Sequence, residues 1–217
     1  MNTHIIHLID GPAGTIETAS TLCDIKKLMP DYGLLLLHPH PLHGGAMSNK
    51  VVTTLGRAAR DVGLATVAFN FRGVGQSQGK WDHGHGELDD AFAVASVMFS
   101  QGVNKLCLAG FSFGGSIAAY LIPRLAESFP ELTLVDLIQV APAVENFPID
   151  VACLRQVPRT VVFNSDDEVV SPNAIQAYAD DVEAHIIRSD LGGHFYHGQL
   201  KRLKTEIVTY YQWRGIL

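Results

Sequence analysis

Hydrophobic residues along the chain fall into short runs that alternate with longer amphipathic segments. Eight of these runs have the length of β-strands. Several are hydrophobic at consecutive positions, as expected for strands that are buried on both faces of a sheet. The predicted strands are residues 4–9, 15–20, 32–38, 64–71, 105–111, 132–140, 159–164 and 184–189.

Five segments between and after these strands have hydrophobic residues at the spacing of one helix face. In the fourth segment, Ser171 and Pro172 form a suitable N-cap and first turn. In the third, Pro123 predicts a bend or a split. The predicted helices are residues 49–63, 86–101, 114–129, 171–182 and 198–213.

This alternation of strands and helices predicts an α/β fold with a mostly parallel, twisted sheet of about eight strands and helices on both faces. The first two strands are separated by the turn sequence DGPAGT, which predicts an antiparallel hairpin at one edge of the sheet. A length of 217 residues without internal repeats or a Pro/Ser-rich linker favours a single domain over residues 1–217.

The net charge of −6, with no basic block, argues against nucleic acid or an anionic membrane surface as a partner. No hydrophobic run approaches the ~20 residues that span a bilayer, and the N-terminus does not resemble a signal peptide, so we expect a cytoplasmic protein. Cys23, Cys107 and Cys153 are far apart and form no C-x-x-C pair, which suits a reducing compartment. We expect Cys107 to be a core residue.

The hexapeptide GFSFGG, residues 110–115, lies between a predicted strand and a predicted helix. A serine at such a sharp turn adopts a strained backbone, and the residues two positions away must be small because strand and helix nearly touch. Gly110 and Gly114 meet this requirement. The motif predicts a nucleophile, Ser112, at the carboxyl edge of the sheet and near the amides of a helix N-terminus.

With three further motifs, the chain resembles the α/β-hydrolase superfamily along nearly its whole length, and within it a group of small, nearly lidless bacterial hydrolases. The other motifs are HPHPLHGGAMSNKVV, FNFRGVGQSQG and GELDD. The resemblance implies an α/β-hydrolase fold with a minimal lid, and residues 143–158 are too few for a helical lid. It also implies that Arg72 pairs with acidic groups of GELDD. Phe147, Ile149 and Leu154 are candidates for either an acyl pocket or core packing.

The resemblance implies a catalytic triad of Ser112, Asp167 and His194. In such a triad the histidine accepts the serine proton, and the carboxylate fixes the tautomer of the imidazole. The acid loop departs from the usual H-G-x-x-D pattern, because this chain has Asn-Ser-Asp-Asp at residues 164–167. The spacing to the following valine pair favours Asp167, and we expect Asp166 to be a solvated turn residue.

Three histidines, His38, His40 and His43, imitate the zinc-binding pattern H-x-H-x-D-H of metallo-β-lactamase-like hydrolases, except that Leu42 replaces the aspartate. Metal-dependent hydrolysis is therefore one alternative. The other role for this segment is to supply a backbone donor to an oxyanion hole. Because proline has no amide hydrogen, the donors available are His40, Leu42, His43 and Gly44.

The family pattern favours the amide of His40, together with that of Phe113 directly after the nucleophile. The sequence thus predicts a serine hydrolase of the carboxylesterase type that cleaves small esters through an acyl-enzyme, without a cofactor or a metal. A second alternative is a non-catalytic binding protein of the same fold. The sequence specifies no oligomeric state.

Overall fold

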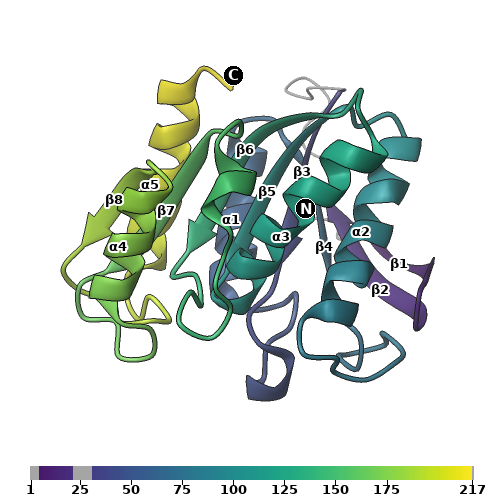
Figure 1. Ribbon diagram of the computed structural model, residues 1–217, viewed down its shortest axis with the longest axis horizontal. Coiled ribbons are helices and arrows are strands. Elements are labelled where there is room, and N and C mark those ends of the chain that lie inside the picture. Colours follow the sequence, from purple (N-terminus) through teal and green to yellow (C-terminus); the bar gives the residue numbers. More distant parts are fainter. Residues whose placement is uncertain (1–4, 22–30, 217) are drawn as a thin grey trace.

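The computed structural model of the chain describes residues 5–21 and 31–216. Cys23 and the first residue of the first predicted strand lie outside these ranges. Within them the chain forms one eight-stranded sheet with helices on both faces (Figure 1).

All eight predicted strands are confirmed, with ends that differ by a few residues. The sheet order is β1-β2-β4-β3-β5-β6-β7-β8. β1 pairs antiparallel with β2, as the hairpin predicts, β2 pairs antiparallel with β4, and the remaining neighbours are parallel. The strands are β1 Ile5–Gly11, β2 Gly14–Thr21, β3 Tyr32–Leu37, β4 Ala65–Phe69, β5 Lys105–Phe111, β6 Thr133–Val140, β7 Arg159–Asn164 and β8 His185–Ser189.

The five predicted helices are also confirmed. α2, α3 and α4 cover one face of the sheet, and α1 and α5 pack together on the other face (Figure 1). Ser171 caps α4 by accepting a hydrogen bond from the Ala174 amide, as expected. The helices are α1 Lys50–Asp61, α2 His85–Ser100, α3 Phe113–Ser128, α4 Pro172–Asp181 and α5 Leu200–Arg214, with 3₁₀ helices η2 Pro41–His43 and η3 Val151–Leu154.

Pro123 lies inside α3, but the helix continues past it, so the expected split is wrong. Pro123 itself is exposed, whereas Leu121, Ile122 and Leu125 on either side of it are buried. Packing of these side chains offsets the helix-breaking cost of a proline, about 3 kcal/mol.

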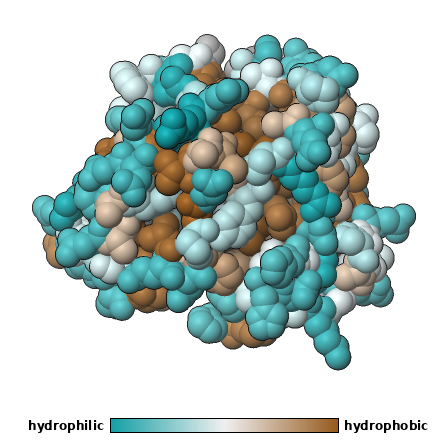
Figure 2. All heavy atoms as spheres, viewed as in Figure 1, coloured by the Kyte–Doolittle hydropathy of each residue, from teal (hydrophilic) through white to brown (hydrophobic). Residues whose placement is uncertain are grey.

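The core is built around β3, whose residues Leu34, Leu35, Leu36 and Leu37 are each at most 3% exposed. Cys107 on the neighbouring strand β5 is fully buried, which confirms its expected place in the core. On the face formed by α2, α3 and α4, hydrophobic residues gather near the centre and hydrophilic ones surround them (Figure 2).

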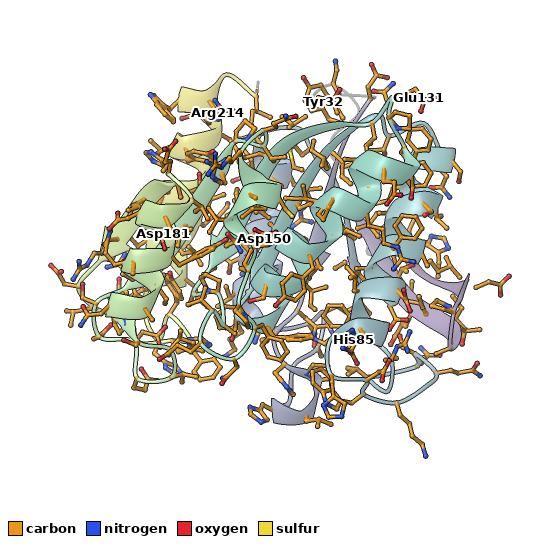
Figure 3. The ribbon with its side chains drawn as sticks, viewed as in Figure 1. Tyr32, His85, Glu131, Asp150, Asp181 and Arg214 are labelled. Atoms are coloured by element: carbon orange, nitrogen blue, oxygen red, sulfur yellow. The ribbon has the colours of Figure 1, made fainter. Side chains whose placement is uncertain are left out.

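The parallel strands share one carboxyl edge. Tyr32, the first residue of β3, lies at one end of the molecule, and His85, at the start of α2, lies near the opposite end (Figure 3). β3 runs from the Tyr32 end toward the His85 end, and β5, β6 and β7 are parallel to it. The loops after β3, β5 and β7 therefore meet at the His85 end. Between β6 and β7 the only helix is η3, with four residues, so no helical lid covers the edge there.

Candidate active site

Ser112 stands at the sharp turn between β5 and α3. Its backbone has φ 54° and ψ −120°, a strained conformation for a residue other than glycine, and its amide donates to the Val140 carbonyl at 2.8 Å. A Cβ atom on Gly110 would overlap the Gly114 carbonyl, and one on Gly114 would overlap the Leu37 carbonyl. The two glycines are therefore required where strand and helix approach, as the motif predicts.

The structure brings Asp167 and His194 together. Asp167 Oδ2 lies 2.8 Å from His194 Nδ1, and the two side chains are 0% and 3% exposed. Asp167 Oδ1 accepts hydrogen bonds from the amides of Val169 and Val170, both at 2.9 Å. These bonds fix the carboxylate, so it can hold one tautomer and one orientation of the imidazole.

His194 also lies against the turn that carries Ser112. Its ring centroid is 4.9 Å from that of Phe111, the residue directly before the serine. Among the described residues, neither Ser112 Oγ nor His194 Nε2 has a hydrogen-bond partner. The proposed nucleophile and the proposed base are thus not hydrogen-bonded to each other in this structure, and no other described group occupies either atom.

Asp166 is an exposed turn residue, as expected, and it also makes contacts that the sequence does not indicate. Its side chain is exposed, yet Oδ2 and Oδ1 accept hydrogen bonds from the amides of Gly192 and Gly193 at 3.0 and 2.9 Å. The bonds from Gly193 and Gly192 lower the pKa of this carboxyl. Asp166 thus ties the loop after β7 to the loop that carries His194.

Two further side chains of the acid loop contact the histidine loop. Glu168 Oε2 accepts from the His194 amide at 3.2 Å, and Asn164 Nδ2 donates to the Gly193 carbonyl at 2.8 Å. No periodic signal in the sequence indicates either contact. Together with Asp166 they fix the backbone from Gly192 to the amide of His194.

The imidazole of His38 supports the backbone at the ends of two strands. The side chain is fully buried, Nδ1 lies 2.6 Å from the Pro39 carbonyl, and Nε2 lies 3.0 Å from the Phe71 amide. An amide is always a donor, so Nε2 accepts and the proton is on Nδ1. Burial lowers the pKa of His38 to about 4, consistent with a neutral ring. Both ring nitrogens are used, so a metal would have to displace one of these bonds.

Two of the four candidate oxyanion donors, the amides of Leu42 and His43, are already hydrogen-bonded to His40. Its ring Nδ1 accepts from the Leu42 amide at 3.2 Å, and its carbonyl accepts from the His43 and Gly45 amides, both at 3.1 Å. The amides of His40 and Gly44 donate to no group in the part of the chain that the structure describes. In the same ranges, no group of three His, Cys, Asp or Glu side chains is placed to hold a metal ion.

Two other expectations are settled by contacts. Arg72 and Asp90, which is part of GELDD, form a buried ion pair with bonds of 3.0 and 2.8 Å from Nε and Nη2, which confirms their pairing. Asp90 also accepts from the Arg72 amide at 2.9 Å.

Of the candidates for an acyl pocket or core packing, Leu154 is fully buried and belongs to the core. Phe147 is half-buried, and its ring centroid lies 4.9 Å from that of Phe113.

Comparison with known proteins bears on the fold and the family of the chain. A family model described as the alpha/beta hydrolase fold matches residues 42–159. The structure of an α/β serine hydrolase homologue from Coxiella burnetii is 37% identical, with a TM-score of 0.82 over 97% of this chain and 98% of that one. An α/β serine hydrolase without a lid from Xanthomonas campestris is 32% identical, with a TM-score of 0.81 over 96% of this chain and 94% of that one.

An uncharacterized protein from Rickettsia prowazekii is 41% identical over 121 residues, which are 54% of this chain and 49% of that protein. The match thus spans about half of the length of that relative. No helix in the described ranges is long and hydrophobic enough to cross a membrane. The serine hydrolase structures support a hydrolase function, and the family model with these structures shows that the chain belongs to the α/β-hydrolase family.

Proposed function

We propose that the protein is a serine hydrolase that cleaves small carboxylic esters through an acyl-enzyme on Ser112. The observation that carries the proposal is the buried pair of Asp167 and His194, 2.8 Å apart, beside the strained turn of Ser112. A buried carboxylate that orients an imidazole next to a nucleophile is the arrangement that general-base catalysis requires.

In the first half of the reaction, Ser112 Oγ attacks the ester carbonyl while His194 Nε2 accepts the serine proton. The bond to the alcohol oxygen then breaks, and the histidine returns the proton to that oxygen. Water repeats the sequence on the acyl-enzyme and releases the acid. Asp167 holds the proton on Nδ1 throughout and stabilises the imidazolium that forms.

The negative charge on the carbonyl oxygen needs preformed donors. We assign the amides of Phe113 and His40 to this role. Phe113 is the first residue of α3, so its amide lies at the positive end of the helix dipole and has no partner within the helix. In the loop after β3, the Leu42 and His43 amides are already bonded, which leaves His40 and Gly44, and of these the family pattern favours His40.

The lack of a helix between β6 and β7 other than η3 supports small substrates, because a long acyl chain would lie in water rather than under a lid. We therefore infer that the substrate is a small-molecule ester. The free thiols of Cys107 and Cys153 support a reducing compartment such as the cytoplasm.

Hydrolysis of p-nitrophenyl acetate by Ser112→Ala tests the proposal. We expect the variant to lose activity. The matched control Ser100→Ala, at the exposed end of α2, should keep the activity of the unmodified protein. Equal activity of Ser112→Ala and the unmodified protein would remove Ser112 as the nucleophile. A folded but inactive unmodified protein would instead support the binding-protein alternative.

A further inference from the structure

Three aromatic rings surround that of Phe113, the residue directly after Ser112, and we call the four rings the aromatic shelf: His40, Trp81, Phe113 and Phe147. Ring centroids are 4.3 Å apart for His40 and Trp81, 5.2 Å for Trp81 and Phe113, and 4.9 Å for Phe113 and Phe147. The rings come from the loop after β3, the loop before α2, the first turn of α3 and the segment after β6.

The aromatic shelf is only partly covered by the protein. Phe113 is fully buried and packs on Phe71, with ring centroids 5.5 Å apart, whereas the other three rings are half-buried. Trp81 and Phe147 pack against the hydrophobic core and yet stay partly exposed, and a group of partly exposed aromatic side chains is a feature of ligand-binding surfaces. The half-buried rings thus leave aromatic surface open around the residue that follows the nucleophile.

Hydrogen bonds hold two of the supporting segments in place. The Tyr120 hydroxyl donates to the Pro148 carbonyl at 3.0 Å, next to Phe147, and the Phe147 amide donates to the Ala143 carbonyl at 2.9 Å. The amide of Asp82, next to Trp81, donates to Glu87 at 3.0 Å. Rings fixed in this way lose little entropy when they bind a ligand.

The ring of His40 also offers a neutral surface. Burial and the neighbouring His43 lower the pKa of His40, so the imidazole is uncharged at neutral pH. Its centroid lies 4.6 Å from that of the His43 ring. A neutral, flat and aromatic surface binds another planar aromatic ring better than it binds a saturated ring of the same size.

The proposed reaction decides which end of the ester the aromatic shelf meets. The alcohol oxygen must face His194 Nε2, because this atom returns the proton to it. The carbonyl oxygen points at the amides of His40 and Phe113, so the acyl substituent takes the remaining position of the tetrahedral carbon, away from His194. The rings of His40 and Phe113 belong to the aromatic shelf, so we place the acyl substituent against it. The ring of Phe195 lies 5.0 Å from the His194 ring and, among the described residues, contacts no ring of the shelf.

We infer that the protein prefers esters of aromatic carboxylic acids, with the aromatic ring of the acyl group stacked on the aromatic shelf. This inference rests on the proposed esterase function. It adds a substrate class to that function and assigns Trp81 and Phe147 as specificity-determining residues.

The test compares kcat/KM for methyl phenylacetate and methyl cyclohexylacetate, with acid release followed in a pH-stat. The two acyl groups have similar size, and a methylene separates the ring from the reacting carbonyl in both. We expect the unmodified protein to prefer the phenyl ester by about two- to tenfold. Trp81→Leu should lose this preference, and Trp81→Phe, which keeps a ring, should retain most of it.

Phe195→Leu is the matched control, because this half-exposed ring contacts His194 and Phe111 but, among the described residues, no ring of the aromatic shelf, and the ratio should not change. Equal rates for the two methyl esters would overturn the inference. An aromatic preference confined to benzyl acetate over cyclohexylmethyl acetate would overturn it as well, by moving the ring to the alcohol side. Labelling of Ser112 by a fluorophosphonate separates these outcomes from failure of the proposed function, because only the latter abolishes labelling.

Discussion

Replacing Asp167 by asparagine tests how His194 is oriented. The Asp167 carboxylate holds two amides on Oδ1, at 2.9 Å each, and His194 Nδ1 on Oδ2, at 2.8 Å. The two amides require an acceptor, so the asparagine oxygen should remain on them. Its NH₂ group then faces His194 Nδ1. The imidazole proton must move to Nε2, and the ring can no longer accept the proton of Ser112.

The size of the effect follows from burial of the pair. The Asp167 and His194 side chains are 0% and 3% exposed, so water has little access to support another orientation of the ring. The same exchange in a serine protease triad lowers kcat by about 10⁴-fold through the wrong tautomer. This factor corresponds to about 5.5 kcal/mol in the activation barrier. We expect a loss of this order for Asp167→Asn.

Steady-state kinetics with p-nitrophenyl acetate measure the loss, and Asp166→Asn is the matched control. An asparagine at position 166 retains one oxygen that can accept from Gly192 or Gly193, so kcat should stay within about tenfold of the unmodified protein. The reasoning is refuted if Asp166→Asn is the inactive variant and Asp167→Asn remains active.

Three further predictions concern stability, metals and chain length. Burial raises the pKa of Asp136 from 3.8 to about 7. At about 1.36 kcal/mol per pH unit, the protonated carboxyl contributes about 4 kcal/mol to the free energy of unfolding. This contribution is fully present below pH 3.8 and is lost as the pH rises through 7. The Tm from circular dichroism should therefore fall between about pH 4 and 7, and Asp136→Asn should flatten the fall; equal slopes would contradict this. EDTA or phenanthroline should leave esterase activity unchanged, because His38 uses both ring nitrogens; loss of activity that zinc restores would support the metal alternative. Without a lid, p-nitrophenyl acetate should have a higher kcat/KM than the decanoate, and a steady rise with chain length would indicate a hydrophobic groove.

The elements and the nucleophile could be predicted because their signals are local. The strands are consecutive hydrophobic runs, and the turn at Ser112 needs glycine at positions fixed by covalent geometry. Asp167 was distinguished from Asp166 by the spacing that the family resemblance implies, and the contact with His194 agrees with that choice. The sequence could not show that α3 continues past Pro123 without a split, because the buried neighbours on either side belong to tertiary packing.

The contacts between the two loops could not be predicted in this way. Asp166 binds amides 26 and 27 residues later in the chain, and a backbone amide carries no mark in a sequence. Glu168 binds the amide of His194, which lies 26 residues later in the chain. The aromatic shelf was missed for a related reason, since its rings come from four segments that meet only after folding.

The central claim is that Ser112 is the nucleophile, and covalent labelling tests it most directly. The unmodified protein is treated with a fluorophosphonate, digested and mapped by mass spectrometry, with Ser112→Ala and Ser100→Ala in parallel. We predict one adduct, on Ser112, that is present in Ser100→Ala and absent from Ser112→Ala. An adduct on another serine, or none on a folded protein that hydrolyses esters, would contradict the mechanism.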